Sequence, residues 1–221
     1  MSETKRVEVD GLGWFVISRE DGAIHDFKGQ GRFSAFARTP KGFLLSLIFD
    51  AEEEDRISEL AEKLEEQGIT PKILHAVFTD EAMTKAEKDE FLYLFSGGDD
   101  RWRFGGGFNN VDDEVYETLL EKLEEAGLTE EEAKERLDEL FPEAVRVSSF
   151  GFENVRDEIE REVRNELERL RGTESVEDYL YGLLEAVERV NETLNEAYRD
   201  RLYETLAEEL PELRDDNSPE P

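Results

Sequence analysis

The chain has no cysteine, only two histidines and no long apolar run. The absence of cysteine excludes disulfides, thiolate zinc sites and cysteine nucleophiles, and two histidines argue against an imidazole-based metal site. No segment approaches the roughly 18 uninterrupted apolar residues of a membrane span, and the first residues lack the apolar core of a signal peptide. We therefore expect no membrane segment, and a protein located in the cytoplasm or in a virion assembled there.

Basic residues are also scarce: 27 Lys and Arg face 58 Asp and Glu, which gives a formal net charge of −31 over 221 residues. Such self-repulsion destabilises a compact chain at low ionic strength, where the Debye length is roughly 30 Å, and is tolerated in molar salt, where that length is about 3 Å. The composition therefore predicts an acidic protein of a halophilic organism with a salt-rich cytoplasm, or of its virus.

The surplus of acidic residues is uneven along the chain. Residues 1–49 hold seven basic and six acidic residues, whereas residues 112–221 hold 13 basic and 36 acidic ones. Two interpretations stay open. Part of the surface of the first segment contacts something other than water, or a sheet packed on both faces leaves little exposed area there.

Residues 1–109 are predicted to form an α+β domain built on a mostly antiparallel sheet. Apolar stretches separated by turn-forming residues predict a meander of four strands, the last of which is apolar enough to be central, at 12–18, 23–28, 32–38 and 42–49. After the meander, a helix is predicted over 51–67, ended by Gly68, and a strand over 69–78. A short helix from Thr79 or Asp80 to Lys88 and a hairpin that pairs 91–95 with 102–108 complete this domain.

The remainder of the chain is predicted to be mainly helical. Residues 110–151 hold two helices, 112–126 and 129–141, and a possible returning strand over 143–149; Thr129 and Glu132 form a capping box at the second helix. Residues 152–210 form a helical arm or hairpin, with helices over 153–171 and from 176 to about 209. Residues 211–221 are a polar tail predicted to be disordered.

The last helix carries a heptad seam typical of coiled coils. At 1.5 Å per residue the helix before it spans about 28 Å and this one roughly 50 Å, so about half of the seam is left uncovered in a hairpin. The sequence therefore predicts a homo-oligomer, or docking of another protein, through an interface formed by Val187, Val190, Leu194, Ala197, Tyr198, Leu202 and Leu206.

The segment around residue 100 offers two further hypotheses. Gly97-Gly98-Asp99-Asp100 resembles the metal-binding hairpin of palm-type nucleotide cyclases and polymerases, a resemblance that implies Mg²⁺ held by Asp99 and Asp100. Arg101 follows where those hairpins carry an apolar residue, so the tetrapeptide is interpreted as a turn. The following residues interleave cations with aromatic rings and form a possible nucleic-acid or partner contact: Arg101, Trp102, Arg103 and Phe104.

No set of residues predicts catalysis or a bound cofactor. His25 and Asp26 are adjacent on a predicted strand and point to opposite faces, and His75 lies in a predicted core strand. The leading hypothesis is therefore a non-enzymatic interaction or assembly protein. The alternatives are a nucleic-acid-associated regulator that uses the N-terminal sheet and Arg101–Phe108, or an acidic mimic of nucleic acid.

Overall fold

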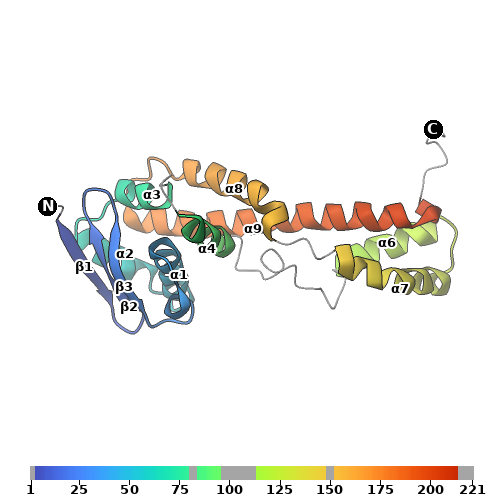
Figure 1. Ribbon diagram of the computed structural model, residues 1–221, viewed down its shortest axis with the longest axis horizontal. Coiled ribbons are helices and arrows are strands. Elements are labelled where there is room, and N and C mark those ends of the chain that lie inside the picture. Colours follow the sequence, from blue (N-terminus) through green and yellow to red (C-terminus); the bar gives the residue numbers. More distant parts are fainter. Residues whose placement is uncertain (1–2, 80–83, 96–112, 148–151, 214–221) are drawn as a thin grey trace. The chain divides into compact units, whose positions relative to one another are not determined.

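The computed structural model describes residues 3–79, 84–95, 113–147 and 152–213. The chain divides into two compact units: unit 1 comprises residues 1–99 and 156–191, and unit 2 comprises residues 100–155 and 192–221. The predicted α+β class is confirmed, because an antiparallel sheet near the N-terminus is followed by helices (Figure 1). The coiled-coil character expected of the last helix stays a prediction.

Unit 1 begins with a three-stranded antiparallel sheet in the order β1-β2-β3. Its strands are β1 (Thr4–Val9), β2 (Gly13–Ser18) and β3 (Ile24–Gly29). The register places Val7 opposite Phe15, and Phe15 opposite Phe27, on the face that helices α1 and α2 cover (Figure 1). The strands predicted at 12–18 and 23–28 are confirmed, whereas β1 was not predicted because charged residues occupy its outer positions.

The predicted strands at 32–38 and 42–49 are wrong. The first is a loop with a short 3-10 helix, η1 (Ser34–Phe36), and the second lies inside helix α1 (Pro40–Glu53). Thr39 caps this helix, since its Oγ1 accepts a hydrogen bond from Gly42 N at 3.2 Å, and Pro40 occupies the first turn. Residues 41–48 are all buried, so this part of α1 is enclosed around its circumference, and a mainly apolar run fits a buried helix as well as a buried strand.

The predicted helix over 51–67 is in fact the end of α1 followed by a second helix, α2 (Ile57–Glu66). The chain turns between them at Asp55, whose φ of 56° lies in the left-handed region. Gly68 ends α2 as expected: its φ is 76°, and the next residue's amide returns to Leu64 O at 3.0 Å. The apolar face predicted for this helix is buried, namely Ile57, Leu60, Ala61 and Leu64.

The predicted strand over 69–78 is wrong, because residues 71–79 form helix α3 (Pro71–Thr79). Thr70 begins it as Thr39 begins α1: Leu74 N donates to Thr70 O at 3.0 Å, and a proline follows the threonine. The next helix is α4 (Lys85–Phe95), so the strand predicted at 91–95 is also wrong. The remaining features predicted here, a cap at Asp80 and a strand over 102–108, lie outside the described residues.

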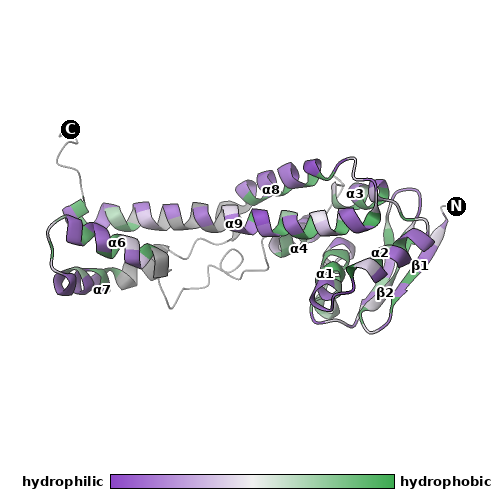
Figure 2. Ribbon diagram, turned by 180° about the vertical axis from the view of Figure 1, so that it is seen from behind, coloured by the Kyte–Doolittle hydropathy of each residue, from purple (hydrophilic) through white to green (hydrophobic). Residues whose placement is uncertain are grey.

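Two long helices confirm the sequence-based prediction: α8 (Phe152–Arg169) and α9 (Val176–Glu209). Residues 156–169 of α8 and 176–191 of α9 belong to unit 1. Figure 2 shows α8 as mainly hydrophilic. Its buried apolar residues recur at helical spacing, namely Ile159, Val163 and Leu167. Between the helices, the buried Glu166 carboxylate accepts a hydrogen bond from Arg189 Nε at 2.7 Å and also pairs with Arg169.

Unit 2 contains helices α6 (Asp113–Glu125) and α7 (Glu130–Val147), the C-terminal part of α9 and the 3-10 helix η2 (Pro211–Leu213). Both predicted helices and the capping box are confirmed: Thr129 N donates to Glu132 Oε2 at 2.9 Å, and Glu132 N to Thr129 Oγ1 at 3.3 Å. The strand predicted over 143–149 is wrong, since α7 continues to Val147. Within the described ranges, none of the helices is both long and apolar enough to span a membrane.

Candidate functional site

Three of the seven predicted interface residues are buried within the single chain. Val187 and Val190 are buried in unit 1, and Leu206 is buried in unit 2. The side chains of the other four lie outside the described part of the structure, namely Leu194, Ala197, Tyr198 and Leu202. The described part of the seam therefore offers no open surface to a partner, and the interface through the last helix stays a prediction.

The residues predicted for metal and nucleic-acid binding lie outside the described residues: Asp99, Asp100, Arg101, Trp102, Arg103 and Phe104. Elsewhere, in the ranges that the structure describes, no group of three or more His, Asp or Glu side chains is placed to hold a metal ion.

The two histidines occupy different environments. His25 is exposed on β3, and the carboxylate of Asp26 accepts a hydrogen bond from Phe27 N at 2.9 Å. His75 lies on helix α3, not on a strand, with its ring edge-to-face on the buried Tyr179 at a centroid distance of 6.2 Å. Burial lowers the pKa of His75 and raises the pKa of the Tyr179 hydroxyl.

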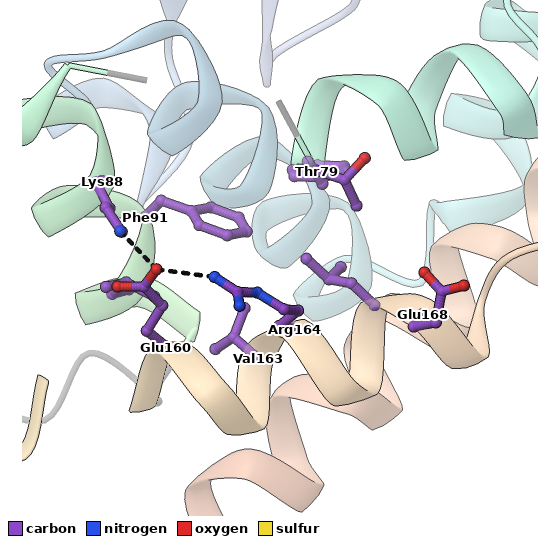
Figure 3. A pocket seen from close by; sticks show the side chains of 10 residues that line it. Thr79, Lys88, Phe91, Glu160, Val163, Arg164 and Glu168 are labelled. Carbon is purple, nitrogen blue, oxygen red and sulfur yellow. Dashed lines mark hydrogen bonds and ion pairs between the residues drawn. The ribbon is translucent and has the colours of Figure 1, made fainter. Parts of the chain in front are cut away.

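A groove of about 490 Å³ lies between α3, α4 and α8 within unit 1 (Figure 3). Phe91 and Val163 contribute to its apolar lining. On its rim Glu160 pairs with Lys88 at 2.6 Å and with Arg164 at 3.1 Å. The hydroxyl of Thr79 donates to His75 O at 2.7 Å. The Thr79 hydroxyl is thus engaged by the backbone, and the groove combines an apolar lining with an ion-paired rim.

A different surface departs from the rest of this acidic chain: the basic-aromatic loop, residues 30–38, which connects β3 to α1. No Asp or Glu occurs from residue 27 to residue 49, although the net charge of the chain is −31. The side chains of Arg32 and Arg38 are exposed, and Phe36 is 81% exposed and Phe33 37% exposed. The loop therefore combines exposed aromatic rings with cationic groups.

A buried carboxylate fixes the conformation of this loop. Asp50 of α1 is only 2% exposed, and it accepts hydrogen bonds from Phe33 N at 2.7 Å and from Ser34 N at 2.9 Å. A Cβ at Gly31 would overlap this carboxylate, so the close approach requires glycine. Because a buried charge is tolerated only when it is hydrogen-bonded, the loop and Asp50 stabilise one another.

Further contacts anchor both ends of the loop. Leu12 O accepts hydrogen bonds from Gln30 N at 2.8 Å and from Ser34 Oγ at 3.2 Å. Arg32 pairs with Glu53 at 2.6 Å and its guanidinium lies 5.2 Å from the Phe33 ring centroid, while Arg38 N donates to Glu90 Oε1 at 2.7 Å. The loop is thus ordered before any partner binds, which lowers the entropic cost of binding.

Sequence reasoning missed this loop because its alternating apolar residues fit the pattern of a strand. The signal that identifies it is the interleaving of Arg32 and Arg38 with two phenylalanines, a pattern that residues 101–104 share. No protein-family model, curated protein or solved structure matches this chain.

Proposed function

We propose that this protein is a non-enzymatic interaction or assembly protein of a salt-rich cytoplasm, and that it docks another protein through the basic-aromatic loop. The observation that carries the proposal is the exposure of Phe36, which is 81% accessible on a loop held by the buried Asp50. Because the Phe36 ring stays largely in contact with water, it adds little apolar burial to the stability of the fold. A contact with a partner gives the ring a role, because it removes the apolar surface from water.

A protein partner fits this surface better than a nucleic acid does. Contacts between arginine and phosphate lose affinity steeply as salt concentration rises, which disfavours a nucleic-acid partner in a salt-rich cytoplasm. Apolar burial does not depend on charge, so an aromatic anchor remains effective in molar salt. Aromatic residues and arginine are also the residue types enriched at the centres of protein-protein interfaces.

Site-specific photo-crosslinking in the cells that make the protein tests this proposal. A photoreactive phenylalanine analogue replaces Phe36, and the matched control carries it in place of His25, which is exposed on β3 outside the loop. We expect a discrete protein adduct from position 36 that is absent from position 25 and is lost when Arg32→Glu and Arg38→Glu are added. An adduct with nucleic acid, no adduct, or the same adducts from both positions would contradict the proposal.

A further inference from the structure

The third exposed large hydrophobic side chain among the described residues lies on an acidic surface. Tyr181 of α9 is 47% exposed, and its neighbours three and four positions away include Glu177, Asp178 and Glu185, all exposed. We define the acidic-aromatic face as Glu177, Asp178, Tyr181, Leu184, Glu185 and Glu188. The opposite side of this part of α9 is buried in unit 1, through Tyr179, Leu180 and Leu183.

The exposed large hydrophobic residues of the described chain are therefore divided between two surfaces of opposite charge. Phe33 and Phe36 lie beside arginines, and Tyr181 lies among carboxylates. We propose that the acidic-aromatic face of a second copy of this chain is the surface that the basic-aromatic loop docks. This inference rests on the docking function proposed above and names its partner.

The charges decide which surfaces pair. A two-fold contact that brings two loops together would oppose the arginines of one copy to those of the other, and two acidic-aromatic faces would oppose their carboxylates. A contact between the basic-aromatic loop of one copy and the acidic-aromatic face of the other instead pairs aromatic rings with an aromatic ring, and guanidinium groups with carboxylates. The contact is therefore heterologous: each copy contributes one loop and one face.

Local charge, not the net charge of −31, governs this contact in a salt-rich solution. At molar salt the Debye length is about 3 Å, so the repulsion between two acidic chains is screened while groups in direct contact still interact. Two carboxylates of the face are held in place, because Ser58 donates to Glu177 and Arg189 pairs with Glu185 at 3.3 Å. The face is thus positioned before docking, as the loop is.

Complementation between two variants tests the pairing. Sedimentation of the full chain in molar KCl should show self-association. Phe36→Ser or Tyr181→Ser should each weaken it about tenfold or more, since each removes an aromatic ring that the contact would bury. An equimolar mixture of the two variants should form a two-chain complex, because one intact loop then meets one intact face. His25→Ser, at an exposed ring outside both surfaces, should associate as the wild type does.

The crosslinking experiment separates failure of this inference from failure of the docking function. An adduct that joins position 36 to the α9 peptide containing Tyr181 of a second copy supports the pairing. A position-36 adduct with a different protein leaves the docking function standing and overturns self-assembly. A monomeric wild-type chain in molar KCl, variants that associate as the wild type does, or a mixture that fails to associate would also overturn the pairing.

Discussion

One buried carboxylate determines the shape of the candidate site. Asp50 projects from the largely buried helix α1, and its two carboxylate oxygens accept hydrogen bonds from the backbone amides of Phe33 and Ser34. This arrangement ties the exposed part of the loop to helix α1, whose residues 41–48 are all buried. The exposure of Phe36 is therefore a consequence of the loop's fixed path, not of a missing contact.

We expect Asp50→Asn to lower the free energy of unfolding by about 1–3 kcal/mol, because the amide has one acceptor oxygen and leaves one buried backbone N–H without a partner. The matched control is Asp21→Asn: the exposed Asp21 carboxylate accepts from Ala23 N at 3.1 Å, and its loss should cost less than about 1 kcal/mol. Chemical unfolding in molar KCl measures both values. Equal changes at the two positions would show that Asp50 does not hold the loop.

At the scale of elements, the contact between α3 and α9 contains a titratable group. Tyr179 OH lies 3.5 Å from His75 Nδ1. Burial lowers the pKa of His75; the nearby Glu168 carboxylate raises it, and Arg171 lowers it. The folded state therefore favours the neutral imidazole.

Because the unfolded chain keeps the ordinary histidine pKa of about 6.5, it binds more protons than the folded chain just below that pH. This contribution to stability is complete above about pH 6.5 and is lost as the pH falls towards the lower pKa of the folded state. His75→Gln should flatten this part of the pH profile of the unfolding midpoint. A His75→Gln variant that keeps the wild-type pH profile would contradict the assignment.

The elements also show why two helices were predicted as strands. The stretches at 42–49 and 69–78 are short apolar runs, and such runs have no periodicity that separates a buried strand from a buried helix. A Thr-Pro pair precedes the first stretch, Thr39-Pro40, and another lies at the start of the second, Thr70-Pro71. In the structure these pairs begin helices α1 and α3, so a threonine N-cap followed by proline, and not the apolar run, distinguishes helix from strand here.

At the scale of the whole molecule, the net charge of −31 dominates the expected response to solvent. We expect the free energy of unfolding to rise as KCl increases from about 0.1 M, where the Debye length is about 10 Å, to about 1 M, where it is about 3 Å. Circular dichroism during chemical unfolding at each salt concentration measures this. An equal molarity of sucrose should not reproduce the low-salt part of the increase, since sucrose does not screen charge. A flat salt profile would contradict the prediction of adaptation to salt.

The sequence by itself determined the features that depend on composition or on neighbours along the chain. These include the acidic surplus, the α+β class, and the helices that have an N-terminal capping box or apolar residues at regular helical spacing. Helix α7, with its capping box of Thr129 and Glu132, is an example. Tertiary structure alone decided which apolar runs became helices and which phenylalanines were buried. Phe43 stacks on Phe27 at a centroid distance of 4.7 Å, whereas Phe36, seven residues earlier, is 81% exposed. The physical reason is that burial depends on contacts between residues far apart in sequence, such as that of Asp50 with Phe33, which no local pattern records.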